Sequence, residues 1–302
     1  MSRPATAVWA TLAALGTGLL LLITSTQVGA VGPPAASAAP TATYDLAVGG
    51  SGSVGFQPTF LHPHGEPTDE GYADYLAAKE AARWPGLTLG RIGCPGTTTN
   101  SFIDGGAHCF YREGSQLQNA VDFLRAHPTT ALVTVDLGFN DVVHCLHHMN
   151  LDEACVDNGL AEVRTQLPRI LAQLRAAAPK STLLVGVGHY DPFLGDYVRG
   201  PSGQAFALAS VNVITRLNDA LRAAYAQAGM PMADVAGAFD LGDTTVVDAA
   251  GLGSVPADVA RVCSWTWMCA PAPLGPNLHP NDAGYRVIAG ALANAVAQFK
   301  SD

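Results

Sequence analysis

Short apolar segments that end at or beside glycine alternate with longer segments of helical periodicity along most of the chain. The apolar segments cover residues 44–48, 131–137, 181–187 and 230–235. The helical pattern, with apolar residues three or four positions apart, recurs at 116–126, 160–178, 211–228 and 282–299. Strands that alternate with helices favour a parallel sheet, and strands without polar alternation are buried on both faces. We therefore expect an α/β fold: a three-layer α/β/α sandwich with a central parallel sheet.

The first 38 residues differ in composition from the rest of the chain. Residues 1–38 carry one charge, on Arg3, and residues 8–23 are almost wholly apolar. Residues 36–38 then fit the A-x-A cleavage pattern, with a second candidate at 28–30. This layout predicts a signal peptide at 1–38 and a single domain at 39–302 that is secreted or held outside the cytoplasm, in the cell envelope. The alternative is that the apolar stretch is retained as a membrane anchor.

All six cysteines follow the predicted signal peptide, and an even count in an exported chain suggests three disulfides. Six cysteines allow 15 pairings, but here they form three tight local clusters. The spacing predicts the pairs Cys94–Cys109, Cys145–Cys155 and Cys263–Cys269. The competing interpretation is a metal site, but the chain has no C-x-x-C pair and thiolate ligands are unfavourable in an oxidising compartment. We expect no metal.

Charge excludes one class of partner. The net charge is −9 with only 16 Lys and Arg residues, and no basic run occurs. A nucleic-acid surface needs clustered cations to neutralise phosphates, so we expect no nucleic-acid partner.

Polar side chains follow the predicted strands, where an open parallel sheet binds its ligands. Ser51 stands among glycines after the first strand, and Asn140 follows residues 131–137. Gly96 lies in another glycine-containing loop, and His279 precedes Pro280 at the entrance of the last predicted helix. Each feature alone is also typical of a plain turn, a helix cap or a structural histidine. The glycine-rich turn lacks the lysine of a phosphate-binding loop.

Taken together and in this order, these segments resemble the four sequence blocks of the SGNH/GDSL hydrolase family. The blocks span residues 48–285, and the stretch at 262–269 is similar to secreted actinobacterial esterases and lipases. The resemblance implies an SGNH hydrolase-like, flavodoxin-like fold with Ser51 as nucleophile and His279 as base. It also implies that the oxyanion donors are the backbone N–H groups of Ser51 and Gly96 and the side-chain amide of Asn140. Ser53 is the alternative nucleophile if the register differs.

Two departures from the family pattern stand out. Gly50 replaces the aspartate of the motif, and no acidic residue lies two or three positions before His279. The imidazole still needs an acceptor for its second N–H. The backbone carbonyl of Pro276 is our preferred acceptor, which would complete a Ser–His dyad, and Oδ1 of Asn277 is the other candidate.

These residues predict a secreted serine ester hydrolase that forms an acyl-enzyme and needs no cofactor. The expected substrate is a small-molecule or lipid ester, with a carbohydrate acetyl ester as the second choice. We expect a monomer that contacts the cell envelope. The alternative is an envelope or glycan-binding protein that kept the fold and lost turnover. A separate cluster, His144, His147 and His148, would share one face if a helix ran there, and could then bind zinc. We favour a solvated, pH-sensitive surface for these histidines instead.

Overall fold

A five-stranded parallel sheet forms the centre of the computed structural model, which describes residues 42–106 and 108–299. The predicted signal peptide lies outside the described residues. The sheet order is β2-β1-β3-β6-β7, and every neighbouring pair is parallel. The strands are β1 (Thr43–Gly49), β2 (Leu87–Arg91), β3 (Thr130–Asp136), β6 (Leu183–Val187) and β7 (Met232–Ala233).

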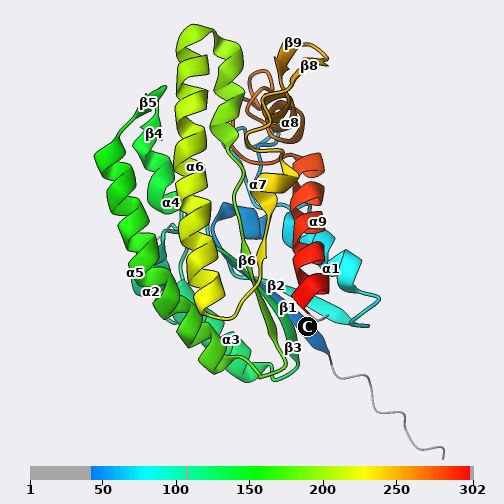
Figure 1. The fold of residues 1–302 in the computed structure, drawn as a ribbon. Helices are drawn as coiled ribbons and strands as arrows, with labels where there is room; N and C mark the ends of the chain where they lie inside the picture. The colour runs from blue at the N-terminus through cyan, green and yellow to red at the C-terminus, as the bar shows by residue number, and fades with distance from the viewer. Residues whose placement is uncertain (1–41, 107, 300–302) are drawn as a thin grey trace, which may run out of the picture. The chain divides into compact units, whose positions relative to one another are not determined.

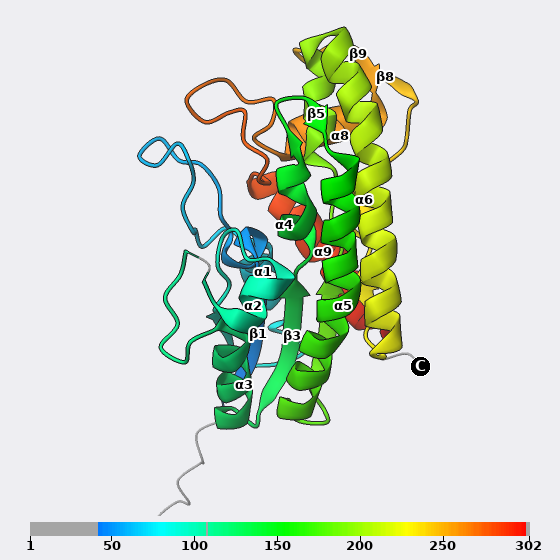
Figure 2. The same ribbon diagram turned by 90° about the vertical axis from the view of Figure 1, so that its left-hand side faces the viewer.

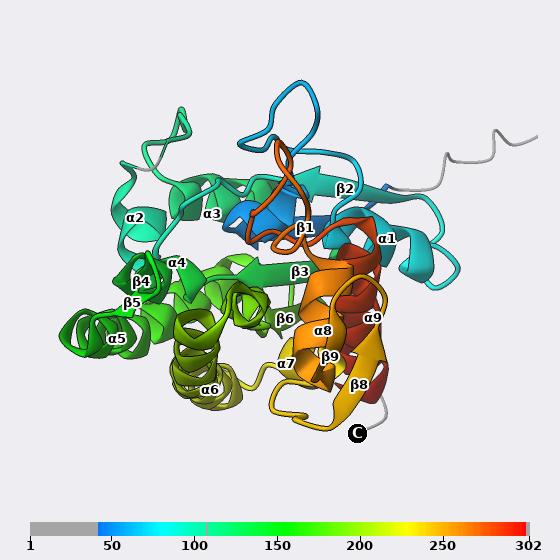
Figure 3. The same ribbon diagram turned by 90° about the horizontal axis from the view of Figure 1, so that it is seen from above.

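Helices cover both faces of this sheet (Figure 1; Figure 3). Leu46 and Val48 of β1 pack in one core with α3 (Gln116–Ala126), α5 (Glu153–Ala177) and α6 (Pro201–Gln227). Ala47, on the opposite face of β1, belongs to a second core. The helices of that core are α1 (Tyr72–Glu80), α8 (Ala257–Trp265) and α9 (Asp282–Phe299). The predicted three-layer sandwich is confirmed, and its two cores explain why the strands are apolar on both faces.

The long helices were predicted well, because each buries an apolar stripe. The boundaries of α3 coincide with the prediction, and the side chain of Ser115 caps its first turn. Helix α6 begins ten residues before the predicted start, with Pro201 at its first position. Strand β2 was not predicted, because this edge strand is short and only half-buried. Helix α1 was also missed.

The stretch at 237–276, which is rich in glycine and proline, contains several short elements. It holds the end of α7 (Val235–Ala238), the antiparallel hairpin β8 (Val246–Ala249) and β9 (Gly253–Pro256), and α8. The remaining short elements are α2 (Thr99–Asp104), α4 (Phe139–Val142), β4 (Leu146–His147), β5 (Asn150–Leu151), η1 (Ser51–Val54), η2 (Val143–Cys145) and η3 (Pro192–Arg199). None of the helices in the described part of the chain is long and apolar enough to cross a membrane.

The sheet order reverses at β1, since β2 lies on one side of it and β3 on the other. The crevice beyond the carboxyl ends of such strands is where open α/β sheets bind ligands. Figure 2 shows the loops around residues 60 and 272 projecting on the same side of the molecule. Trp267 joins the two loops through a 3.2 Å hydrogen bond from its Nε1 to Oε1 of Gln57. The fold therefore brings the segments after β1 and before α9 together at this crevice.

Candidate active site

The turn after β1 holds Ser51 at the start of η1. Gly49 has φ +124°, and a Cβ there would collide with the carbonyl of Asp136, so the position requires glycine. Gly50 donates its N–H to the same carbonyl at 2.8 Å, which holds the turn against the end of β3. Ser51 is half-buried, whereas Ser53 is fully buried and donates its hydroxyl to the carbonyl of Gly50 at 2.6 Å. Ser53 tightens the turn, and Ser51 is the serine that faces the crevice.

His279 lies against Ser51. Its Nε2 is 3.0 Å from Oγ of Ser51, and its Nδ1 is 2.7 Å from Oδ1 of Asn277. The loop that carries both residues is fixed by Trp267, which donates its backbone N–H to the carbonyl of His279 and accepts one from Asn277. Two side chains far apart in the sequence thus meet in a hydrogen-bonded series, Asn277–His279–Ser51.

Beside Nδ1 of His279 the structure has Oδ1 of Asn277, the second of the two acceptors that the sequence offered, rather than the preferred carbonyl of Pro276. The reason is a local turn: Oδ1 of Asn277 also accepts the backbone N–H of His279 at 3.0 Å. This second bond holds the carboxamide oxygen beside the imidazole, in the direction of Nδ1. An uncharged amide oxygen, two residues before the histidine, therefore lies beside Nδ1, where a catalytic triad has its carboxylate.

The proton arrangement at His279 follows from these partners. Oδ1 of an amide accepts hydrogen bonds only, so Nδ1 carries the hydrogen and Nε2 presents its lone pair to the Ser51 hydroxyl. Burial lowers the pKa of His279 to about 4, because the charged form loses its hydration. The imidazole is therefore neutral at neutral pH and able to accept the serine proton.

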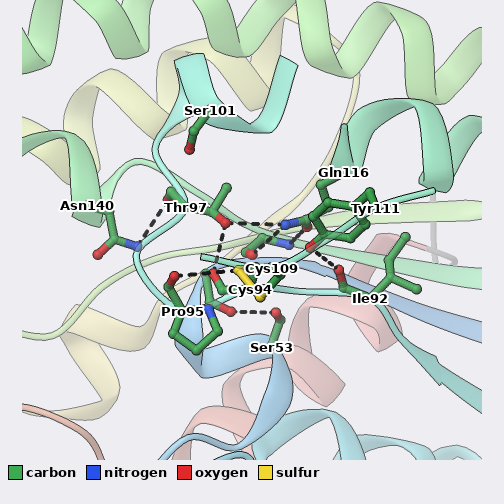
Figure 4. Close-up of a disulfide and its surroundings, with 12 residues drawn as sticks. Ser53, Ile92, Cys94, Pro95, Thr97, Ser101, Cys109, Tyr111, Gln116 and Asn140 are labelled. Atoms are coloured by element: carbon green, nitrogen blue, oxygen red, sulfur yellow. Dashed lines mark hydrogen bonds between the residues drawn. A yellow bond between two sulfur atoms is a disulfide. The ribbon is translucent and has the colours of Figure 1, made fainter. Parts of the chain in front are cut away.

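Asn140 lies on α4, across the crevice from Ser51. Its Nδ2 donates to the carbonyl of Thr97 at 3.0 Å (Figure 4). A Cβ on Gly50 would lie 2.9 Å from the same nitrogen. Asn140, Gly50 and Ser51 line one cavity together. Gly96, with φ +77°, immediately precedes Thr97 and is not among the residues that line this cavity. A larger residue at position 50 would therefore require the amide of Asn140 to shift.

Asp141 has a different role from its neighbour. Its carboxylate accepts the backbone N–H of Thr99 at 3.0 and 3.1 Å and the hydroxyl of Thr99 at 2.6 Å. These bonds fix α4 to the first residue of α2. Burial raises the pKa of Asp141 to about 6, and the Thr99 bonds oppose that rise.

All three predicted disulfides are present, with Cα–Cα distances of 5.9, 5.6 and 5.0 Å in sequence order. Cys94–Cys109 anchors the loop that presents Thr97 to Asn140. The bonded sulfurs of Cys145 and Cys155 lie near His144, but a disulfide offers no thiolate to a metal. No helix carries His144, His147 and His148 together, because η2 gives way to the β4–β5 hairpin and His148 has φ +52°. The condition for a shared histidine face is therefore not met.

The sequence did not single out Gln116 or Asp136, which the structure places at the site. Gln116, the first residue of α3, accepts the N–H of Gly49 at 2.6 Å and donates to its carbonyl at 3.1 Å. Asp136 ends β3 under the Ser51 turn and lines the cavity beside His189. A carboxylate at the end of an apolar strand was the available signal for Asp136. Nothing distinguished Gln116 from other polar residues at a helix start.

Comparison with known proteins identifies the family. A sequence profile of the GDSL-like Lipase/Acylhydrolase family matches residues 47–287. No curated protein matches the chain. The fold is similar to the extracellular lipase from Streptomyces rimosus, with 20% identity and a TM-score of 0.53, covering 84% of this chain and 100% of that one. Phospholipase A1 from Streptomyces albidoflavus NA297 has 19% identity and a TM-score of 0.53, covering 84% and 99%.

A third similar fold is a catalytic mutant of Axe2, an acetylxylan esterase from Geobacillus stearothermophilus. It has 13% identity and a TM-score of 0.50, and the match covers 84% of this chain and 93% of that one. At these identities the three structures support the fold, while the family profile spans most of the described chain. The chain belongs to the GDSL-like lipase/acylhydrolase family, the SGNH/GDSL hydrolases.

Proposed function

We propose that this protein is a serine ester hydrolase in which Ser51 is the nucleophile, His279 is the base and Asn277 orients the imidazole. The observation that carries the proposal is the 3.0 Å contact between Nε2 of His279 and Oγ of Ser51. It is supported by the 2.7 Å contact that fixes the hydrogen of the imidazole on Nδ1. A serine hydroxyl is a weak nucleophile and reacts only when a base takes its proton.

In the first half of the reaction, the Oγ–H proton moves to Nε2 of His279 as Oγ attacks the ester carbonyl carbon. The carbonyl oxygen becomes an oxyanion, for which the Ser51 N–H, the Gly96 N–H and Nδ2 of Asn140 are the proposed donors. The C–O bond to the alcohol then breaks, and the imidazolium gives its proton to the leaving alkoxide.

In the second half, His279 takes a proton from water as the water oxygen attacks the acyl-enzyme. The bond to Oγ of Ser51 breaks, and the serine regains its proton from the imidazolium, so that acid and free enzyme are released. The two steps balance with ester and water alone. The reaction thus needs no cofactor.

The three disulfides support an oxidising compartment, and we propose that the protein works outside the cytoplasm. The extracellular lipase from Streptomyces rimosus has a similar fold.

A fluorophosphonate probe followed by peptide mass spectrometry tests the nucleophile directly. We expect the label on Ser51 in the mature protein and in the Ser53→Ala control, and no label in His279→Ala. A label on Ser53 would contradict the assignment. Absence of any label on a folded protein would favour the alternative of a binding protein without turnover.

A further inference from the structure

Gln116, the first residue of α3, has a buried side-chain amide that bonds to two loops of the candidate site. The residue is 1% exposed. Its Oε1 accepts the N–H of Gly49 at 2.6 Å. Its Nε2 donates to the carbonyl of Gly49 at 3.1 Å and to the hydroxyl oxygen of Thr97 at 3.3 Å (Figure 4). An amide nitrogen has two hydrogens, so each of them has a partner. The proposed reaction gives Gln116 no role.

The bonds to Gly49 bear on the nucleophile turn. Gly49 ends β1 and stands two residues before Ser51. Its N–H and its carbonyl both bond to the one amide of Gln116, and the carbonyl also accepts the N–H of Cys94 at 3.0 Å. The side chain of Gln116 thus fixes the piece of backbone from which the Ser51 turn begins.

The bond to Thr97 bears on a second turn, residues 94–97. The N–H of Thr97 donates to the carbonyl of Cys94 at 3.2 Å, and the Thr97 hydroxyl donates to the same carbonyl at 2.8 Å. Between them, Gly96 has φ +77°, a positive value such as the third residue of a type II turn requires. Because the Thr97 hydroxyl gives its hydrogen to Cys94, its oxygen is left to accept from Gln116. This turn carries the N–H of Gly96, one of the proposed oxyanion donors.

The carbonyl of Thr97 determines how the amide of Asn140 is turned. It lies 3.0 Å from Nδ2 of Asn140, and a carbonyl oxygen only accepts, so the nitrogen of this amide faces Thr97 and its oxygen does not. That bond uses one hydrogen of Nδ2. The other hydrogen is available to an oxyanion in the cavity that Asn140 lines.

We propose that Gln116 is a positioning residue that sets the spacing of the three oxyanion donors. Its bonds to Gly49 hold the turn that presents the N–H of Ser51. Its bond to Thr97 holds the turn that carries Gly96 and orients Asn140. This inference rests on the proposed ester hydrolase function for its effect on rate. Misplacing a catalytic group by about 1 Å costs rate even when the group itself is unchanged.

Gln116→Met tests the proposal by kinetics, because it keeps the length of the side chain and removes its three polar contacts. We expect kcat to fall at least about 10-fold with KM nearly unchanged, since displaced oxyanion donors are felt mainly in the transition state. Gln118→Met is the matched control. Gln118 lies exposed on the same helix and donates to Asp122, so this variant should keep the wild-type kcat.

A double-mutant cycle separates positioning from a merely structural role. In an Asn140→Ala background, Gln116→Met should lower kcat by a smaller factor than in the wild type, because one of the donors that it positions is already gone. Equal factors in the two backgrounds, or a folded Gln116→Met variant with wild-type kcat, would overturn the proposal.

A measurement without turnover separates this proposal from the ester hydrolase function. In ¹⁵N–¹H NMR spectra, the side-chain amide signals of Asn140 are identified by their absence in Asn140→Ala. Gln116→Met should shift these signals and Gln118→Met should not. Such a shift supports the positioning role even if no ester is cleaved, and unchanged signals would overturn it.

Thr97→Val provides the same test if Gln116→Met does not fold. It removes the hydroxyl that accepts from Gln116 and keeps the carbonyl to which Asn140 donates. We expect it to shift the Asn140 amide signals and to lower kcat in the same direction as Gln116→Met. A folded Thr97→Val variant with unchanged signals and wild-type kcat would overturn the link through Thr97.

Discussion

The carboxamide oxygen of Asn277 lies 2.7 Å from Nδ1 and 3.0 Å from the backbone nitrogen of His279. One neutral acceptor therefore fixes both the ring and the main chain of the proposed base. Since the amide carries no charge, it orients the imidazole with little of the stabilisation that a carboxylate gives to the imidazolium.

Replacing Asn277 by alanine should release the imidazole and lower kcat at least about 100-fold, in the range of general-base contributions. Ester hydrolysis measured at saturating substrate checks this. Asn281→Ala is the matched control, because that side chain caps α9 through the N–H of Gly284 and bonds to Ser264. If Asn277→Ala kept most of its activity, a backbone carbonyl such as that of Pro276 would be the acceptor.

The pH profile should reveal the low pKa of His279. Activity needs the neutral imidazole, so kcat/KM is lost as the pH falls through about 4 and is level from about pH 5 through neutrality. Initial rates over pH 3–8 measure this limb. Asn277→Asp should move the limb to higher pH, because a carboxylate favours the charged imidazole. An acid limb near pH 6.5 in the wild type would mean that burial does not control this histidine.

Asn140→Ala should lower kcat by about 10²–10³-fold with little change in KM, because an oxyanion donor acts mainly in the transition state. Steady-state kinetics with one activated ester separates the two constants. The neighbouring variant Asp141→Asn weakens the contact with Thr99 instead, so it should lower the midpoint of thermal unfolding and affect kcat less. A large rise in KM for Asn140→Ala would assign the amide to ground-state binding.

Asp45 should make stability depend on pH. It is 1% exposed, and its carboxyl oxygens have no hydrogen-bond partner among the described residues. Burial, with the nearby charge of Glu80, raises the pKa of Asp45 to about 8 from 3.8. Between these values the unfolded chain has lost a proton that the folded chain keeps, so the free energy of unfolding falls as the pH rises.

Asn at position 45 cannot ionise, and the benefit of Asp45→Asn should therefore grow from pH 4 to pH 8. We expect a gain of about 2–5 kcal/mol at pH 8 relative to pH 4. Urea unfolding of both proteins at the two pH values measures the difference. A constant difference would indicate that Asp45 is ionised in the folded protein at both values.

Hydrophobic periodicity was enough to predict the sandwich and its long helices, because each buries a continuous apolar stripe. It could not locate β2, whose half-buried edge position leaves no apolar run. The three disulfides followed from local spacing alone.

Part of the candidate site could be predicted from the sequence. Ser51 and Asn140 follow predicted strands, and His279 precedes the last predicted helix. The sequence could not decide whether Pro276 or Asn277 accepts from His279. The answer depends on a local turn, in which Oδ1 of Asn277 accepts the backbone N–H of His279. Asp136 joins the site through strand register, since it pairs with Gly49 across β1 and β3. The position of Asp136 beside the site depends on tertiary structure, and no sequence motif marks this residue.

The contact between Ser51, after β1, and His279, before α9, also limits when the site can form during synthesis. Ser51 is made early and His279 late in synthesis, so a chain that is still emerging holds a serine without its base. The contact between Ser51 and His279 can therefore form only after the segment before α9 has been made and has packed against the turn after β1.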